Sequence, residues 1–281
     1  MSRTLPDLLI STVVRMALAE DLGRTGDVTA QACIPPDARM SGVFAARQSG
    51  VMAGGACVRI AVLEMDPAAT VTIKVADGEA FEAGAVLIEV EANARALLAA
   101  ERTALNLLGR LCGIATLTRT YVQAVAETRA RIADTRKTTP GLRALEKHAV
   151  ACGGGMNHRF GLDDAILIKD NHVAVCGGVG EAVRRARAFA PHLMKVEVEV
   201  DGLDQLDEAL AEQPDVIMLD NFSLADLAEA VRRAEGRVTL EASGGVTLQT
   251  VRAIAETGVD VISVGALTHS VTQLDVGLDA R

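Results

Sequence analysis

The second half of the chain repeats one pattern, a short apolar run followed by a stretch of helical composition. From residue 131 onward we predict six strands, at 131–133, 165–168, 196–200, 216–219, 238–240 and 261–264. Helix-like stretches at 203–212, 223–234 and 247–256 follow the later runs. Repeated strand–helix units form a parallel sheet covered by helices, so the class is α/β. Six units predict a barrel, or a sheet short of the eight strands of a closed barrel.

The first half has a different organisation. Apolar positions on one face predict a helix that starts near Pro6 and ends near Gly23. Short β-like runs at 43–45, 71–75 and 86–90, separated by turn residues, predict a small and mostly antiparallel sheet. The stretch 94–129 has helical composition, and its glycines at 109 and 113 predict a break between two helices.

The composition excludes several classes of protein. The 281 residues include 28 Lys and Arg against 37 Asp and Glu, so the formal net charge is −9, and the chain has one Tyr and no Trp. A nucleic-acid binder needs a basic field and stacking aromatic side chains, so we expect no nucleic-acid partner. No apolar run approaches the roughly 18 residues of a membrane helix, so we expect no membrane association.

The cysteine and histidine patterns are also informative. The five cysteines, at 33, 57, 112, 152 and 176, are scattered and form no Cys-x-x-Cys motif. This odd number argues against a disulfide framework and fits a reducing cytoplasm. No two histidines stand four residues apart, so the sequence disfavours a zinc site. His148 falls inside a predicted helix, and we expect a structural role for it.

Polar residues follow every predicted strand of the second half. They occupy 134–137, 169–172, 197 and 199, 220–221, 241–245 and 264–266. In a barrel of parallel strands these positions meet at one face, where active sites lie. Solvated strand ends and helix caps would explain Ser243 or Asp220 alone. They do not explain cations on two strands facing carboxylates on three others, so the pattern predicts an active site.

Two kinds of chemistry separate within this ring. A cationic group lies in 134–172 and consists of Arg136, Lys137, His158, Arg159 and Lys169. Arginine pairs bidentately with carboxylate or phosphate, so this group predicts a pocket for a small polyanion. Small residues at Ser243-Gly244-Gly245 and at Gly265-Ala266 leave backbone N–H groups accessible after the last two strands, where barrels often bind phosphate.

Two carboxylates lie on neighbouring strands opposite the cations. Glu199 and Asp220 could hold Mg²⁺, bind ribose hydroxyls, or form ion pairs with Lys169 or Lys137. Their spacing leaves these alternatives open.

Long runs of the sequence resemble one family. Residues 134–147, 153–159 and 167–172 closely resemble the quinolinate phosphoribosyltransferases, also called carboxylating nicotinate-nucleotide pyrophosphorylases. Residues 20–29, 101–106, 197–200 and 262–268 resemble the same family, so the likeness covers essentially the whole chain. The sequence departs from the family pattern at His148, Gly109 and Cys112, where Tyr, Gln and Ser are usual.

The resemblance implies a fold and a reaction. The fold is an N-terminal helix and α/β sandwich domain over 1–115, followed by an open TIM-like α/β barrel over 116–281. The reaction is that of a pentosyltransferase of NAD biosynthesis, in which quinolinate and phosphoribosyl pyrophosphate give nicotinate mononucleotide, CO₂ and pyrophosphate, with Mg²⁺. The resemblance also implies a homodimer in which Arg102 reaches the partner's site.

The resemblance further assigns the site residues. The quinolinate pocket would contain Arg102, Arg136, His158, Arg159 and Lys169. The phosphoribosyl pyrophosphate side would contain Lys137, Glu199, Asp220, Ser243, Gly244, Gly245, Val264, Gly265 and Ala266, and Thr135 would join the substrate-binding set. Catalysis would fall to Lys137, Lys169, Glu199 and Asp220, and Glu199 and Asp220 would hold Mg²⁺ directly or through pyrophosphate and water.

Three alternatives remain at this stage. A same-fold paralogue associated with molybdenum-uptake operons would act on another substrate, although the intact runs 136–140 and 157–159 argue against it. A lyase could form a Schiff base on Lys169. A phosphate-sensing protein would bind the same ligands without turnover.

Overall fold

The structure, a computed structural model, describes residues 4–281 and contains two compact units. The second unit consists of Thr120–Lys137 and Gly155–Ala266, and the first contains the remaining described residues. The boundary expected between residues 115 and 116 falls inside one helix, α4 (Ala94–Ala124), and stays a prediction. None of the helices in the described part is both long and apolar enough to cross a membrane.

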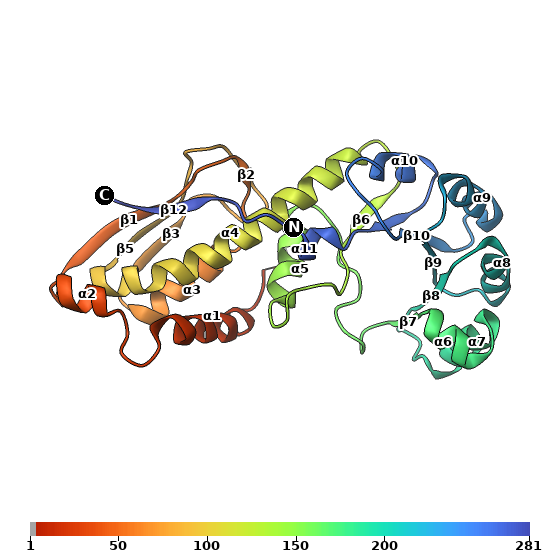
Figure 1. Ribbon diagram of the computed structural model, residues 1–281, viewed down its shortest axis with the longest axis horizontal. Coiled ribbons are helices and arrows are strands. Elements are labelled where there is room, and N and C mark those ends of the chain that lie inside the picture. The colour runs from red at the N-terminus through yellow and green to blue at the C-terminus, as the bar shows by residue number, and fades with distance from the viewer. Residues whose placement is uncertain (1–3) are drawn as a thin grey trace. The chain divides into compact units, whose positions relative to one another are not determined.

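The first unit contains the predicted antiparallel sheet. Its strands are β12 (Val276–Ala280), β1 (Arg39–Ala46), β5 (Val86–Asn93) and β3 (Thr70–Ile73), in that order. A short pair joins β2 (Gly50–Val51) to β4 (Ala80–Phe81). Its helices include α1 (Asp7–Leu22), α2 (Val28–Cys33), α3 (Gly55–Met65) and α5 (Arg143–Cys152), and Figure 1 shows α1 and α3 along one side of the sheet.

The predicted ends of the first helix are confirmed, and three described strands of this unit were not predicted, namely the two-residue strands β2 and β4 and the strand β12. Helix α1 ends at Gly23, which has a φ of 55°, and Asp27 caps α2 by accepting a hydrogen bond from the N–H of Ala30. Strand β12 was not predicted from the sequence, because its pattern is weak and its pairing partner β1 lies more than 200 residues away.

The predicted break in the linking helix is wrong, because α4 runs without interruption from Ala94 to Ala124. Its glycines serve packing. A Cβ added at Gly109 would lie 2.8 Å from the carbonyl oxygen of Leu274, and one at Gly113 would lie 2.3 Å from that of Thr272. The N–H of Leu274 also donates to the carbonyl of Gly109. The two glycines therefore let the C-terminal segment lie directly against the helix backbone.

The second unit contains the predicted parallel sheet, and all six predicted strands are present. They are β6 (Arg131–Ala133), β7 (Ile166–Ile168), β8 (Val196–Val200), β9 (Val216–Asp220), β10 (Thr239–Ser243) and β11 (Val261–Ser263). Their order is β6-β11-β10-β9-β8-β7, with β6 and β7 at the edges. The sheet is therefore an open barrel, and the expected α/β architecture is confirmed.

Helices cover the outside of this curved sheet, as Figure 1 shows. They are α6 (Asp170–Cys176), α7 (Val179–Phe189), α8 (Leu203–Glu212), α9 (Leu224–Ala234) and α10 (Val251–Glu256). The helix expected from residue 247 begins at Val251, because Thr247 and Thr250 form a hydrogen-bonded turn. Helix α11 (Ala266–His269) follows β11.

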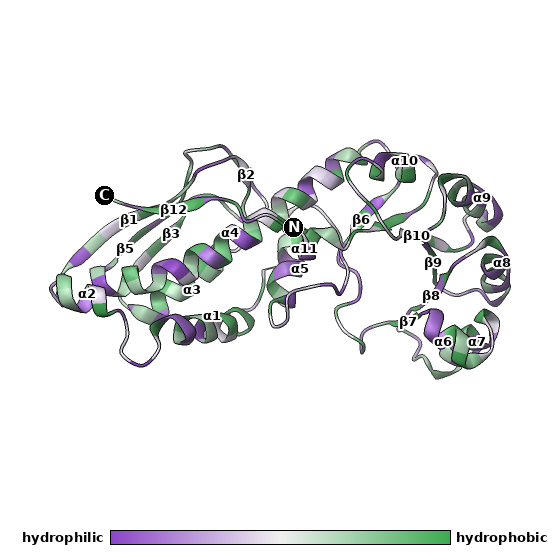
Figure 2. Ribbon diagram, in the orientation of Figure 1, coloured by the Kyte–Doolittle hydropathy of each residue, from purple (hydrophilic) through white to green (hydrophobic). Residues whose placement is uncertain are grey.

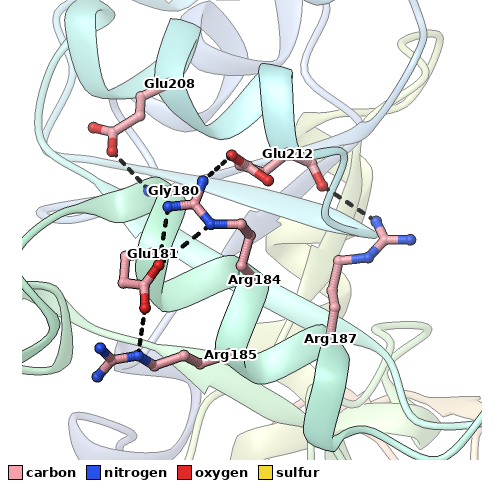
Figure 3. Close-up of polar contacts among 7 residues, drawn as sticks. All are labelled: Gly180, Glu181, Arg184, Arg185, Arg187, Glu208 and Glu212. Carbon is pink, nitrogen blue, oxygen red and sulfur yellow. Dashed lines mark hydrogen bonds and ion pairs between the residues drawn. The ribbon is translucent and has the colours of Figure 1, made fainter.

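The outer helices are amphipathic and are joined by ion pairs. Figure 2 shows hydrophobic and hydrophilic residues mixed along α7, α8 and α9, and the buried positions of α9 are Leu227, Ala230 and Ala234. In Figure 3, Arg184 of α7 pairs with Glu212 of α8 and with Glu181 of its own helix. Exposed pairs of this kind contribute little to stability, so the buried faces fix these helices to the sheet.

Candidate active site

The carboxylates of the site come from an alternating strand. In β8, Val-Glu-Val-Glu-Val, all five residues are buried, and successive side chains point to opposite faces of the sheet. Val196, Val198 and Val200 share one face, so Glu197 and Glu199 share the other with Asp201 just beyond. Buried carboxylates are costly unless polar or charged partners lie beside them. Glu197 has His158 beside it, and Glu199 has Lys169.

A buried aspartate holds the basic run 157–159 against the end of β6. Asp134 is fully buried, and its two carboxylate oxygens accept hydrogen bonds from Asn157 Nδ2 at 2.7 Å and from the N–H of His158 at 2.8 Å. Met156 forms a parallel bridge with Ala133 at the free edge of β6. Asp134 was not among the predicted site residues, and it positions the two that follow Asn157.

His158 lies between two buried glutamates. Its Nδ1 accepts a hydrogen bond from the N–H of Arg159 at 2.8 Å, so the ring proton is assigned to Nε2. Nε2 lies 3.1 Å from Glu197 Oε2 and 3.5 Å from Glu241 Oε1. Burial, followed by repulsion from Glu197, raises the pKa of Glu241 to about 7. Glu241 therefore exchanges its proton near neutral pH, well above the range of an exposed glutamate.

The predicted site residues omitted Glu197 and Glu241, although a signal for both was present. Each lies two residues before a predicted site residue on the same strand, Glu199 in β8 and Ser243 in β10. Residues two apart on a strand share a face, so the inward direction of the later residue predicts that of the earlier one.

Lys169 and Glu199 form an ion pair between the ends of β7 and β8. The Glu199 side chain is buried, whereas that of Lys169 is half exposed. The backbone N–H of Lys169 donates to His172 Nδ1 at 2.9 Å, which fixes the residue at the start of α6. Of the roles left open for Glu199, the structure shows the ion pair with Lys169.

The ends of β9 and β10 are locked together by an asparagine. Asn221 has a φ of 54°, its N–H donates to the carbonyl of Ser243 at 2.9 Å, and its Nδ2 donates to Asp220 Oδ2 at 2.6 Å. Gly244 has a φ of 97°, and a Cβ there would lie 2.1 Å from Asn221 Oδ1. The loop that carries the predicted phosphate-binding residues therefore requires glycine at 244.

Three acids at this edge could hold a divalent cation. One carboxylate oxygen from each of Glu199, Asp201 and Asp220 lies within 4.8 Å of the others. Oxygen ligands of this kind fit Mg²⁺, so the residues present agree with the metal that the resemblance implies. A cavity of about 500 Å³ opens beside them and is lined by Asp201–Gln205, Asn221–Ser223 and Asp226. Because this lining is acidic, an anionic ligand there would need a cation beside it.

Two arginines of the predicted anion pocket lie near each other. Burial, and after it repulsion from the Arg136 guanidinium, lowers the pKa of Arg159. Arg159 also donates to the carbonyl of Ala165 at 3.2 Å. Cations that repel each other in a partly buried site are typical of an anion-binding pocket, because a bound anion relieves the repulsion.

The remaining predicted residues are placed as follows. Thr135 Oγ1 accepts a hydrogen bond from the N–H of Lys137 at 3.0 Å, and the Lys137 side chain is exposed. Val264 donates its N–H to the carbonyl of Ala133, which sets Gly265 and Ala266 beyond the end of β6. Arg102 is exposed on α4, among the residues of the first unit. The second unit thus contains every predicted site residue except Arg102.

Comparisons with known proteins agree with this geometry. The model of the quinolinate phosphoribosyl transferase C-terminal domain matches residues 114–279, and that of the N-terminal domain matches residues 27–112. The chain is 50% identical over 274 residues to the nicotinate-nucleotide pyrophosphorylase [carboxylating] of Mycobacterium leprae (strain TN), covering 95% of each chain. It is 44% identical over 260 residues to the probable nicotinate-nucleotide pyrophosphorylase [carboxylating] of Bacillus subtilis (strain 168), covering 92% of this chain and 89% of that one.

A solved structure shows the same likeness. The nicotinate-nucleotide pyrophosphorylase from Francisella tularensis superposes with a TM-score of 0.94 at 39% identity, covering 100% of this chain and 99% of that one. The motifs, the open barrel with its cations and acids, and the two domain models lead to one conclusion. The chain belongs to the quinolinate phosphoribosyltransferase family.

Proposed function

We propose that the chain transfers the phosphoribosyl group of phosphoribosyl pyrophosphate to quinolinate, with loss of one carboxylate as CO₂. The products are nicotinate mononucleotide and pyrophosphate, and the reaction belongs to NAD biosynthesis. The observation that carries the proposal is geometric: His158 of the basic run 157–159 lies against Glu197 of β8, and Lys169 pairs with Glu199 of the same strand, beside the acids Asp201 and Asp220. The names of the M. leprae and B. subtilis relatives support it.

Quinolinate is a dianion, and burying it without partners would be costly. Arg136 and Arg159 provide two planar forks for its carboxylates, and Lys169 adds a compact charge. His158 is held in place by Asp134, which accepts its backbone N–H, and by Glu197, which lies 3.1 Å from its Nε2. Arg102 would complete the pocket from the partner subunit of a homodimer.

The phosphoribosyl side of the site needs side chains that stabilise the charges that develop on the ribose and on the pyrophosphate during the reaction. Positive charge develops on the ribose as the bond to pyrophosphate breaks, and Glu199 and Asp220 can stabilise it. Lys137 would stabilise the departing pyrophosphate. The loops at 243–245 and 264–266, with Thr135, would bind phosphate through N–H and hydroxyl groups.

Magnesium fits this site beside Glu199, Asp201 and Asp220, and when bound it would neutralise phosphate charge and orient the leaving group. The protein's own residues position the quinolinate nitrogen in line with the ribose carbon. Alkylation of that nitrogen makes the ring an electron sink, so the adjacent carboxylate can leave as CO₂. A cytoplasmic location, expected from the cysteine pattern, stays a prediction.

The decisive experiment compares quinolinate with nicotinate under identical conditions. With phosphoribosyl pyrophosphate as the second substrate, we expect efficient formation of nicotinate mononucleotide from quinolinate, with release of CO₂. We expect inefficient formation from nicotinate. A monocarboxylate leaves one partly buried cation without its partner. Loss of a fully buried partner costs roughly 3–5 kcal/mol, and partial exposure reduces this cost. We therefore expect kcat/KM to fall by about a hundredfold. Equal efficiency with nicotinate would overturn the pocket assignment.

The same assay separates the rival functions. A phosphate-sensing protein would bind both substrates without turnover. The molybdenum-operon paralogue would leave quinolinate unused. A Schiff-base lyase needs an unprotonated amine, whereas Lys169 makes an ion pair with Glu199, so borohydride trapping with a carbonyl substrate is expected to fail.

A further inference from the structure

The first unit contains a second cluster of chemically reactive side chains, which shares no residue with the proposed active site. It consists of Asp77, in the turn between β3 and β4, and His148 and Cys152, both on α5. The two helix residues are four apart, so they lie on one face of α5. His148 Nε2 lies 2.8 Å from Asp77 Oδ2 and 3.4 Å from Cys152 Sγ. We propose that Asp77, His148 and Cys152 bind a thiophilic divalent cation, Zn²⁺.

Hydrogen bonds among Asp77, His148 and Cys152 cannot pair both the carboxylate and the sulfur with His148 Nε2 at the same time. Asp77 already accepts hydrogen bonds from the N–H groups of Gly54 and Gly55, both at 3.2 Å, which fix its carboxylate. One ring nitrogen carries at most one proton, yet Nε2 faces both an oxygen and a sulfur. If Nε2–H donates to Asp77, the sulfur receives no full bond from the ring. If the thiol donates to Nε2, the ring lone pair faces the carboxylate. A cation between the three atoms serves all three lone pairs.

The donor set and its spacing suit zinc. Zinc binds thiolate sulfur, imidazole nitrogen and carboxylate oxygen at about 2.0–2.3 Å, which places neighbouring ligands of a tetrahedral site about 3.2–3.7 Å apart. The three ligand atoms all lie within 4.8 Å of one another, so small side-chain rotations that move these atoms by up to about 1 Å would bring them to this spacing. Cys152 is buried and the His148 side chain is 9% exposed, whereas that of Asp77 is 22% exposed. Water can therefore reach the fourth position from the Asp77 side.

The sequence has no two histidines at i,i+4 spacing, and for that reason it disfavours a zinc site. Here the i,i+4 pair joins a histidine to a cysteine, and the third ligand lies 71 residues away from His148. His148 also departs from the tyrosine usual in the family. The proposed site is thus specific to chains that combine these three residues.

The test uses the full chain with Cys33 and Cys176, the two cysteines that are not buried, replaced by serine. The protein is freed of metals, kept reduced, and titrated with Zn²⁺ in excess Mg²⁺, which occupies oxygen-only sites. We expect one Zn²⁺ per chain, and binding more than about tenfold weaker in Cys152→Ser and in His148→Gln. Equal binding by the background chain and both variants, or no binding by the background chain, would overturn the proposal.

A second readout does not depend on how well the variants fold. Co²⁺ bound to the background chain is expected to show the intense charge-transfer absorption of a thiolate ligand. Co²⁺ binding without that absorption would exclude Cys152 as a ligand and overturn the site. Circular dichroism of each variant checks that lost binding reflects a lost ligand, and His148→Tyr, which restores the usual family residue, is expected to fold and to bind no Zn²⁺.

Discussion

His158 Nε2 lies 3.1 Å from Glu197 Oε2 and 3.5 Å from Glu241 Oε1. Two acids and one imidazole thus share the interior of the barrel, each on a different structural segment. Because like charges this close cannot both be ionised without cost, one acid retains its proton near neutral pH. The pKa of Glu241, raised to about 7 chiefly by burial, identifies that acid.

The first prediction concerns stability against pH. The folded-state pKa of Glu241 lies above its usual unfolded value of about 4.3, so the native state binds more protons between these values. The stabilisation that Glu241 contributes to the free energy of unfolding is therefore complete below a pH of about 4.3. It is lost as the pH rises through about 7. In Glu241→Gln this pH-dependent loss, on the order of 1–3 kcal/mol, should be absent. Urea unfolding at several pH values measures the difference, and parallel curves for both proteins would refute the assignment.

Gly244 gives a second prediction, on packing. Gly244→Ala places a methyl group 2.1 Å from Asn221 Oδ1 at a φ of 97°. Gly245→Ala is the matched control, because Gly245 also has a positive φ, of 57°, but meets nothing within 4 Å. Strain alone costs roughly 1–2 kcal/mol, and overpacking adds about 1–3 kcal/mol. Thermal unfolding should therefore rank Gly244→Ala below Gly245→Ala, and equal stabilities would mean that Asn221 moves aside freely.

A third prediction separates Arg136 from Lys137. Both lie in the loop after β6, where Arg136 is half-buried and Lys137 is exposed, and we assign them to different substrates. Arg136→Ala should mainly raise the KM for quinolinate, because a bidentate carboxylate partner is lost. Lys137→Ala should mainly lower kcat, because charge on pyrophosphate grows in the transition state. The expected increase in the activation free energy is about 2–4 kcal/mol.

Steady-state kinetics with each substrate varied in turn distinguishes these effects. Arg136→Lys, which keeps the charge and loses the planar fork, should fall between wild type and Arg136→Ala. If Lys137→Ala raises only the KM for quinolinate, Lys137 is a carboxylate ligand and the division of the site is wrong.

The fourth prediction tests whether Arg102 acts across a dimer interface. Arg102→Ala and Lys169→Ala should each be inactive, and mixing them should restore activity. At random exchange about half of the dimers are heterodimers with one intact site each, so about a quarter of wild-type activity should return. Subunit exchange is verified independently with tagged chains. Exchange without any recovery would show that Arg102 serves its own subunit.

Local patterns predicted much of this protein. The apolar runs from Arg131 onward placed all six strands, because a buried parallel strand needs a continuous apolar stretch whatever surrounds it. The long basic and glycine-rich runs identified the family. They also indicated where the candidate site lies, since they follow strands whose carboxyl ends a parallel sheet brings to one face. His148 also lies in a helix, α5, as expected.

Other features depended on partners distant in sequence. Gly109 and Gly113 look like helix breakers, yet they accommodate the segment at Thr272–Leu274, which only the fold brings to them. The approach of Asp77 to His148, the ion pair of Lys169 with Glu199, and the proton held by Glu241 arise in the same way. Burial and charge at these positions are set by side chains on other elements. The sequence therefore shows which residues are present, and the tertiary structure determines their contacts and protonation.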